Sequence, residues 1–224
     1  MSSAVNEKHS TMGQKPSTTS SWRTKYLILY NFVSSILWLG VLGRVLMLIP
    51  LAGFPRVYDG VGKYTQMTQS LALLEVIHSA VGIVRAPIST TAMQVASRLL
   101  LVWVVVDPFP FVARSPGYSS MLIAWSVTEV IRYSYFVFNL SGYNPKIIMW
   151  LRYNTFYVLY PLGISSECWL LSKAIAPAGT LHQNFAWFLQ ITRLIYIPGS
   201  YILFTHMIAQ RKKVLRAAKA AKAT

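Results

Sequence analysis

The stretch Trp150-Leu-Arg-Tyr-Asn-Thr-Phe-Tyr-Val-Leu-Tyr-Pro-Leu-Gly-Ile-Ser-Ser-Glu-Cys-Trp169 is long and apolar enough to cross a bilayer, yet it contains the carboxylate of Glu167. On insertion scales a charge in the middle of a membrane costs ~2.5–3.5 kcal/mol. Other apolar stretches hold two more acids and three arginines: Glu75, Glu129, Arg98, Arg132 and Arg193. Such groups must pair, become neutral or line a wet cavity. The sequence therefore predicts an all-α membrane protein with a polar interior.

The composition agrees with a membrane location. The chain has 224 residues and is 54% hydrophobic, with a mean hydropathy of +0.44, which is too apolar for a soluble domain of this size. The net charge of +15 comes largely from the tails and short loops, without a nucleic-acid recognition motif, so we expect no nucleic-acid partner. The one cysteine, Cys168, excludes an internal disulfide framework, and no Cys/His spacing indicates a metal site.

Six membrane-spanning helices are predicted when ~20 apolar residues are counted per crossing. They cover about residues 26–49, 66–84, 88–106, 118–140, 150–171 and 184–208. Segments rich in Pro or Gly separate them at residues 50–62, 85–87, 107–117, 141–145 and 177–179. Only a few residues join the second and third spans, so a re-entrant pair is the alternative there. The expected fold is a six-transmembrane-helix bundle.

The tails indicate how the bundle is oriented. An even number of spans puts both termini on one side, and the basic residues in both tails place that side in the cytosol by the positive-inside rule. Residues 1–21 are expected to be a disordered cytosolic tail, 22–209 the six-span membrane domain and 210–224 a basic cytosolic tail. The first apolar run is too long for a signal peptide and no cleavage site follows it, so we expect a retained span.

Tyr160 and Glu167 are the main candidates for chemistry. They lie seven residues apart on the fifth span, which brings them to nearly one helix face, ~10 Å apart along the axis. Helical side chains tilt toward the amino end, so Glu167 should reach toward Tyr160. Gly163 removes a side chain between them and leaves room for a substrate. A phenol and a carboxyl across a small gap suit proton transfer at adjacent carbons. A buried structural pair is the alternative.

The remaining acids in the spans are expected to have structural partners. Glu75, His78 and Ser79 share one helix face by their i, i+3, i+4 spacing. We favour a polar seam there, with Glu75 paired to an arginine. Arg132 follows Glu129 at i+3, which also favours a structural pair.

Two further arginines are candidates for support of the site or binding. Arg98 follows Gln94 on one helix face, and Arg152 lies at the expected cytosolic rim, where it could bind a phosphate. The chain has no dinucleotide loop, P-loop, histidine cluster or G-x-S-x-G elbow. Redox and phosphoryl-transfer chemistry are disfavoured, and acid–base chemistry without a cofactor or metal remains.

Four segments carry a likeness to a known family. They are residues 74–84 around Glu75-Val-Ile-His78, Gln94-Val-Ala-Ser-Arg98, Glu129-Val-Ile-Arg132-Tyr, and residues 151–167 ending in Tyr160-Pro-Leu-Gly163-Ile-Ser-Ser-Glu167. Together they resemble the very-long-chain (3R)-3-hydroxyacyl-CoA dehydratases, also called the protein-tyrosine-phosphatase-like family. The likeness extends from about residue 26 to the carboxyl tail, and its fifth-span motif is the specific part.

The resemblance implies a six-span enzyme of the endoplasmic-reticulum membrane, with both termini cytosolic. It would dehydrate very-long-chain 3-hydroxyacyl-CoA to trans-2-enoyl-CoA, the third step of each fatty-acid elongation cycle, beside membrane lipid and other elongation enzymes and without a cofactor. The catalytic Tyr and Glu of the family correspond to Tyr160 and Glu167. Its supporting residues correspond to Gln94, Arg98, Arg132, Arg152 and Gly163.

Two other functions can be compared with the sequence. The older family name refers to a phosphatase loop, His-Cys-x5-Arg, which here is His78-Ser79-x5-Arg85. A phosphatase needs a thiolate nucleophile, so the serine excludes that activity. A small proton-coupled transporter that uses intramembrane carboxylates as a relay is the alternative function on physical grounds. Residues 26–106 and 118–208, however, show no convincing internal repeat of the kind that transporters often have.

Overall fold

The computed structural model describes residues 21–223, and every regular element in that part of the chain is a helix. In chain order the elements are α1 (Trp22–Ala52), α2 (Phe54–Ser70), α3 (Leu73–Ala80), α4 (Ile88–Leu99), the π-helix η1 (Leu100–Val106), α5 (Pro110–Ala113), α6 (Pro116–Leu140), α7 (Lys146–Asn154), α8 (Phe156–Leu181) and α9 (Gln183–Ala223). The all-α prediction is confirmed for these residues. The expected disordered tail at residues 1–21 lies, except for Ser21, outside the described part.

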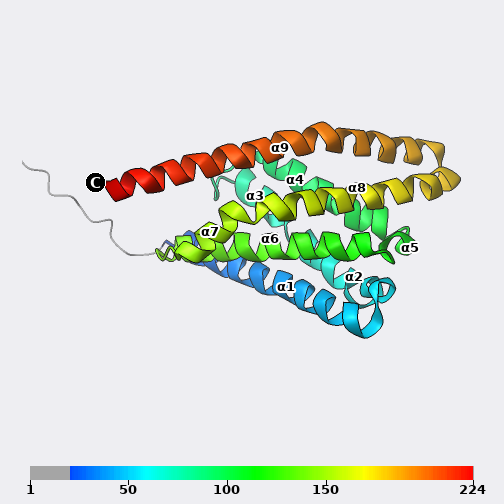
Figure 1. Ribbon diagram of the computed structural model, residues 1–224, viewed down its shortest axis with the longest axis horizontal. Coiled ribbons are helices and arrows are strands. Elements are labelled where there is room, and N and C mark those ends of the chain that lie inside the picture. The colour runs from blue at the N-terminus through cyan, green and yellow to red at the C-terminus, as the bar shows by residue number, and fades with distance from the viewer. Residues whose placement is uncertain (1–20, 224) are drawn as a thin grey trace, which may run out of the picture.

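The long helices lie side by side along one axis (Figure 1). α6 is central, because it packs against α1 on one side and α8 on the other. α8 in turn packs against α9, while α2 packs against α1 and α3 against α4. α1 begins and α9 ends at the same end of the molecule, and α5 lies at the opposite end (Figure 1).

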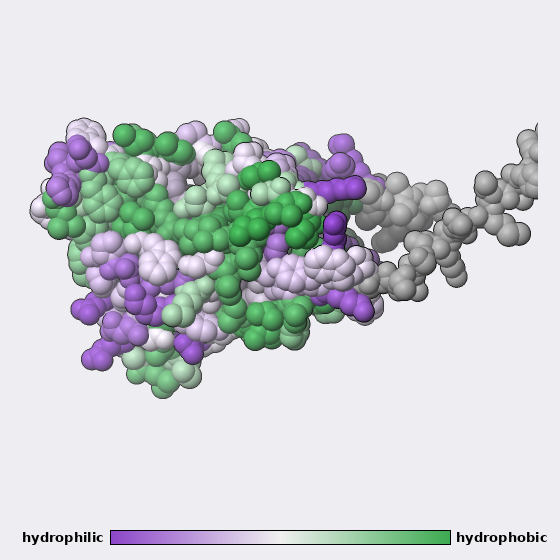
Figure 2. Space-filling model, turned by 180° about the vertical axis from the view of Figure 1, so that it is seen from behind, coloured by the Kyte–Doolittle hydropathy of each residue, from purple (hydrophilic) through white to green (hydrophobic). Residues whose placement is uncertain are grey.

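Two helical segments are long and apolar enough to cross a membrane: residues 22–52 and residues 88–106. Figure 2 shows hydrophobic side chains over much of the middle of one face, with hydrophilic residues gathered toward its ends. The other long helices contain polar side chains that point inward; α6, for example, buries Ser126 and Glu129. Such side chains lower the hydropathy of a helix without facing lipid. The molecule fits a membrane protein, and the six-span arrangement stays a prediction.

Two predicted connections between spans are wrong. Residues 50–62 are helical except for Gly53, and α2 begins at Phe54. Pro50 lies in the last turn of α1, and Pro55 lies in the first turn of α2, where a proline's missing N–H has no helical partner to lose. Gly53 makes the turn with a φ of 78°, which favours glycine. Residues 177–179 likewise continue α8 through Pro177, and the chain turns at His182.

The second predicted span also differs from the structure, because turn residues 71 and 72 separate α2 from α3. α3 then returns into α4 through residues 81–87, where Gly82 has a φ of 73°. Since α3 packs against α4, this connection is a helical hairpin.

The apolar core holds α6 and α8 in a fixed relation. Its fully buried side chains come from α1, α2, η1, α5, α6, α8 and α9, and include Val41, Val61, Val105, Leu122, Leu170 and Leu171. Protein interiors are close-packed, so these side chains leave little freedom for one helix to slide on another. The packing therefore decides which α6 residues face the middle of α8.

Candidate active site

Glu167 lies on the inward face of α8 with 7% of its surface exposed. Its Oε1 accepts a hydrogen bond from the indole Nε1 of Trp125 on α6, at 2.7 Å. A Cβ added at Gly163 would lie 3.8 Å from the same oxygen, so the carboxyl group folds back toward the amino end of α8. This is the direction that the tilt of helical side chains predicts. No ion pair in the described part of the chain includes Glu167.

Tyr160, two turns earlier on α8, is turned toward α9. Its hydroxyl donates to the backbone oxygen of Ser200 at 3.0 Å, and its ring stacks on Phe204 with 5.7 Å between the centroids. The ring lines an open, largely apolar pocket of about 260 Å³ between α8 and α9. The pocket includes Pro161 and Tyr201 but not Glu167. The phenol and the carboxyl group therefore share a helix without sharing a cavity.

α9 contacts both candidate residues. Tyr196 and Ser200 are four residues apart, so they lie one turn apart on this helix. Tyr196 lies close to the carboxylate of Glu167, and its buried hydroxyl has no hydrogen-bond partner of good geometry among the described residues. The backbone oxygen of Ser200 accepts a hydrogen bond from the hydroxyl of Tyr160. Tyr160 and Glu167 therefore both lie along the contact between α8 and α9.

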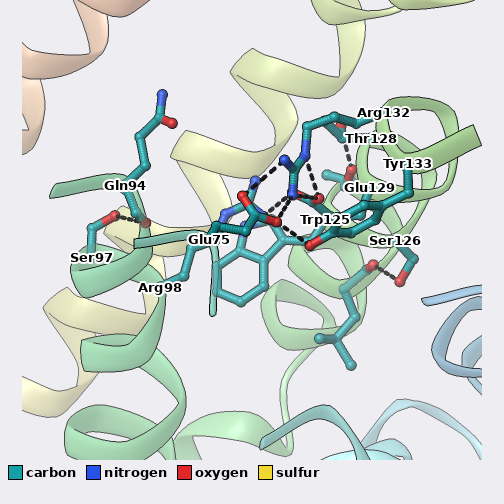
Figure 3. Close-up of polar contacts among 12 residues, drawn as sticks. Glu75, Gln94, Ser97, Arg98, Trp125, Ser126, Thr128, Glu129, Arg132 and Tyr133 are labelled. Carbon is teal, nitrogen blue, oxygen red and sulfur yellow. Dashed lines mark hydrogen bonds and ion pairs between the residues drawn. The ribbon is translucent and has the colours of Figure 1, made fainter. Parts of the chain in front are cut away.

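A cluster of charges lies beside this contact (Figure 3). Arg132 of α6 is its centre: Nη1 and Nη2 donate to the Glu75 carboxylate at 3.0 and 2.7 Å, and Nε donates to Glu129 at 2.7 Å. Tyr133 also donates to Glu75, at 2.5 Å, and Arg98 pairs with Glu129. Two acids and two arginines leave the cluster without net charge. The predicted pairs Glu129–Arg132 and Glu75–arginine are both confirmed.

Trp125 joins the charge cluster to Glu167. The guanidinium carbon of Arg98 lies 5.1 Å from the centre of the Trp125 ring, while the N–H at the ring edge binds Glu167. Gln94 is not part of this arrangement, because its side chain is exposed and points away from the cluster (Figure 3). The structure brings Arg98 and Arg132 to the site, and it leaves Gln94 outside.

Arg152 lies in the last turn of α7, near the end of the bundle where α8 begins. Its guanidinium carbon is 4.4 Å from the ring centre of Tyr135 and 4.9 Å from that of Phe136. Cation–π contacts of this kind hold the head group at the end of α6. Arg152 is therefore separate from the charge cluster.

A family model described as "Protein tyrosine phosphatase-like protein, PTPLA" matches residues 69–217, which is more than half of the chain. The chain belongs to this family. The match includes every element of the site described above. It also includes the segment to which the phosphatase-like name refers.

Curated relatives of this protein have a more specific name. A Schizosaccharomyces pombe protein named "Probable very-long-chain (3R)-3-hydroxyacyl-CoA dehydratase" is 43% identical over 205 residues, covering 88% of this chain and 96% of the relative. The Arabidopsis thaliana dehydratase PASTICCINO 2 is 38% identical over 211 residues, covering 88% and 96%. The human very-long-chain (3R)-3-hydroxyacyl-CoA dehydratase 2 is 35% identical over 206 residues, covering 86% and 81%.

These relatives confirm the family resemblance found in the sequence. They cover most of the chain, and their names are those of dehydratases, which are lyases. No solved structure matches this chain.

The phosphatase-like segment is a helix end in this protein. His78 is buried, and its Nε2 lies 2.9 Å from the hydroxyl of Tyr26. The backbone N–H groups of Ile83 and Val84 donate to the His78 carbonyl, at 2.9 and 3.2 Å. A phosphate loop needs free N–H groups that converge on an anion. These are occupied, which agrees with the absence of the nucleophilic cysteine.

Trp125 and Tyr196 are not among the residues predicted from the sequence, although both lie against Glu167. Trp125 is four residues before Glu129, so the i, i+4 rule places it on the polar face of α6. That spacing was a usable signal. Tyr196 lies on α9 in an apolar run that gives no local hint of its neighbour. Among the described residues, no three His, Cys, Asp or Glu side chains gather as metal ligands.

Proposed function

We propose that this protein is a hydro-lyase that converts very-long-chain (3R)-3-hydroxyacyl-CoA to trans-2-enoyl-CoA, the third step of the fatty-acid elongation cycle. The names of its relatives supply the reaction. The observation that supports this site is the hydrogen bonding of the Glu167 carboxylate. Arginines hold Glu75 and Glu129, whereas Glu167 receives a neutral indole N–H. A buried carboxylate without an ion partner is available to accept a proton.

The reaction needs an acid and a base at adjacent carbons. The C2–H bond breaks and its electrons form the C2=C3 double bond, while the C3–O bond breaks and the hydroxyl leaves as water after it gains a proton. A carboxylate is the better base near neutrality, so Glu167 takes the C2 proton. Tyr160 protonates the departing hydroxyl, and transfer of the proton from Glu167 back to Tyr160 restores both groups.

Substrate binding would change the contact between α8 and α9. The hydroxyl of Tyr160 would exchange the Ser200 carbonyl for the C3 oxygen of the substrate. Pro198 lies inside α9, two residues before Ser200, and removes one helical hydrogen bond there. Fewer bonds then resist a local opening of α9. The apolar pocket beside Tyr160 suits part of an acyl chain.

The basic end of the bundle suits the phosphates of coenzyme A. Arg152 lies there, with Lys146 at the start of α7. Arg211 of α9 donates to Asn154 at 2.9 Å and so lies near the same end. We place this end at the cytosolic face of the endoplasmic-reticulum membrane in a six-span topology, where other elongation enzymes would supply the substrate. Arginine forks match phosphate oxygens well.

The proton-relay transporter receives less support from the site. A relay through Glu75, Glu129 and Glu167 requires each carboxylate to bind and release a proton. Two of the three are held by guanidinium groups, which favour the charged form and oppose protonation. The structure therefore favours a single active carboxylate over a chain of three.

Assay of the purified full chain in detergent with a very-long-chain (3R)-3-hydroxyacyl-CoA tests the proposal. Wild type should form the trans-2-enoyl-CoA, and Tyr160→Phe and Glu167→Gln should each lower the rate at least ~100-fold, the scale of lost acid–base catalysis. Tyr157→Phe, an exposed position on the same helix, is the matched control and should keep its rate. An active Glu167→Gln protein with normal folding would overturn the site.

A further inference from the structure

Trp125 is placed to control the carboxylate of Glu167. It is 3% exposed on α6, and its indole N–H donates to Glu167 Oε1 at 2.7 Å. Oε2 accepts no hydrogen bond of normal geometry from the described residues. Tyr196 of α9 also lies close to the carboxylate, but its hydroxyl makes no hydrogen bond of normal geometry with the described residues. The indole N–H is therefore the donor that fixes the orientation of the carboxylate. An indole N–H is only a donor, so it orients the carboxylate without exchanging protons with it near neutral pH.

Arg98 of α4 lies against the indole ring of Trp125 and helps to fix its position. Arg98 lies over the ring face at 5.1 Å and is paired with Glu129, which follows Trp125 by one turn on α6. A cation over the face of a tryptophan is attracted by the ring quadrupole. The ring therefore has the cation at its face and the carboxylate at its edge. Arg98 forms no ion pair with Glu167 in the described part of the chain.

The separation of the Arg98 guanidinium from the Glu167 carboxylate has a chemical consequence. A guanidinium in direct contact with Glu167 would form a strong charged hydrogen bond and make the carboxylate a weaker base. The indole supplies orientation with a neutral donor instead. The Arg98–Glu129 pair, at the same time, keeps the ring from rotating.

We propose that Trp125 is a positioning residue, which holds Glu167 by Oε1 in the orientation for C2 proton abstraction and separates it from Arg98. The inference rests on the proposed dehydratase function. Trp125 touches no reacting atom and acts through Glu167. A misplacement of ~1 Å at a reacting group can lower a rate ~100-fold, so a lost positioning bond should appear in kcat.

Trp125→Phe removes the N–H and keeps an aromatic ring. We expect kcat to fall ~10–100-fold, the scale of a hydrogen bond to a charged group, with KM changed less than about threefold. Without its donor the carboxylate should hold a proton more strongly, so the acid limb of the kcat–pH profile should move to higher pH. The control is Trp103→Phe, which removes an indole bond to Ser70 Oγ at 3.0 Å on an exposed part of the molecule.

The measurements use the full chain purified in detergent, with melting temperature recorded beside kcat, KM and the pH profile. If Trp125→Phe does not fold, Trp125→β-(3-benzothienyl)alanine decides, because this isostere replaces only the N–H by sulfur. An unshifted acid limb, with or without a lower melting temperature, would show that Trp125 is only packing and overturn the inference. An inactive wild type would instead refute the dehydratase function, and the inference would fall with it.

Discussion

The three acids Glu75, Glu129 and Glu167 differ in the donor that each carboxylate receives. Glu75 and Glu129 accept from guanidinium groups, whereas Glu167 accepts from the indole of Trp125. A guanidinium cancels the charge that burial makes unfavourable, and the resulting pair is structural. A neutral N–H leaves the carboxylate able to take a proton. At the scale of single residues, the donor distinguishes the two acids held by arginines from the proposed catalytic acid, Glu167.

Gly163→Ala tests whether space beside Glu167 is used by a substrate. The new Cβ would lie 3.7 Å from Ala124 and 3.8 Å from Glu167 Oε1, which are ordinary contacts. Alanine is also the better helix former by ~1 kcal/mol, so the melting temperature should stay equal or rise. The methyl group should nevertheless obstruct the substrate and lower kcat/KM at least ~10-fold.

Gly43→Ala is the control for this substitution, because a Cβ at Gly43 in α1 meets no atom within 4 Å. It should gain similar helix stability and keep full activity. Equal turnover of Gly163→Ala and wild type would mean that the substrate approaches Glu167 from another side.

At the scale of elements, α6 supplies most of the polar contacts of the interior. Trp125, Glu129 and Arg132 follow one another at i, i+4 and i+7, so they share one face of the helix. Through them α6 binds Glu167 of α8, Arg98 of α4 and Glu75 of α3. The cluster thus ties three helices to α6.

Arg132→Ala should lower the amount of folded protein more than the activity of each folded molecule. Removing Arg132 leaves Glu75 without its ion partner, and breaking a buried pair costs ~3–5 kcal/mol. Arg98→Ala should lower the stability of the fold less, because Glu129 still forms an ion pair with Arg132. Thermal unfolding and size-exclusion yield measure both effects. Arg193→Ala is the control, since within residues 21–216 Arg193 donates only to Ser172, at 3.0 Å. Unchanged melting with a collapsed turnover would make Arg132 a substrate-binding residue.

A second polar link joins α2 to the end of η1, far from the termini. Asp107 accepts from Gln66 at 2.8 Å and from Lys63 at 3.1 Å. These hydrogen bonds, that of Gln66 first, lower the pKa of the Asp107 carboxyl below its ordinary value of 3.8. A lowered pKa in the folded state stabilises the fold above the ordinary value, and this stabilisation is lost as the pH falls through the folded pKa.

Asp107→Asn should therefore flatten the acid side of a plot of melting temperature against pH, below about pH 4–5. At pH 7 the variant should melt slightly lower than wild type. Asp59→Asn is the control, because Asp59 is only at the 4.0 Å limit of an ion pair with Arg114. An identical acid slope in wild type and Asp107→Asn would show that this link adds no pH-dependent stability.

At the scale of the whole molecule, the two ends of the bundle differ. The start of α1, the end of α6 and the carboxyl end of α9 lie at one end, and α5 lies at the other (Figure 1). Asn139-Leu-Ser141, the one glycosylation sequon in the chain, is in the last turn of α6. The proposed topology puts this end in the cytosol, whereas glycosylation is lumenal.

Asn139 should therefore remain unmodified when the protein is expressed in a cell that glycosylates. The measurement is the mass of the purified chain before and after glycosidase treatment. A glycine-rich loop with a sequon, inserted after His182 between α8 and α9, is the positive control and should be modified. A glycosidase-sensitive mass that disappears in Asn139→Gln would invert the proposed orientation and move the coenzyme A end.

Several features could be predicted from local sequence alone. The helices themselves, the Glu129–Arg132 pair and the backward tilt of Glu167 all follow from periodicity and hydropathy within one segment. The connections at residues 50–62 and 177–179 were mispredicted, because prolines at helix ends resemble breaks in composition. Whether a proline lies inside the last turn of a helix or outside the helix depends on backbone geometry.

The sequence by itself determined a helical, membrane-type protein with a charged interior, and Tyr160 and Glu167 stay its predicted catalytic pair. Only the tertiary structure decided that Arg132 holds Glu75, 57 residues away, and that Trp125 rather than an arginine binds Glu167. Contacts between helices depend on which faces pack, and close packing selects one arrangement from many that local propensity allows. The donor that each of these carboxylates receives is therefore decided by packing and not by its own segment.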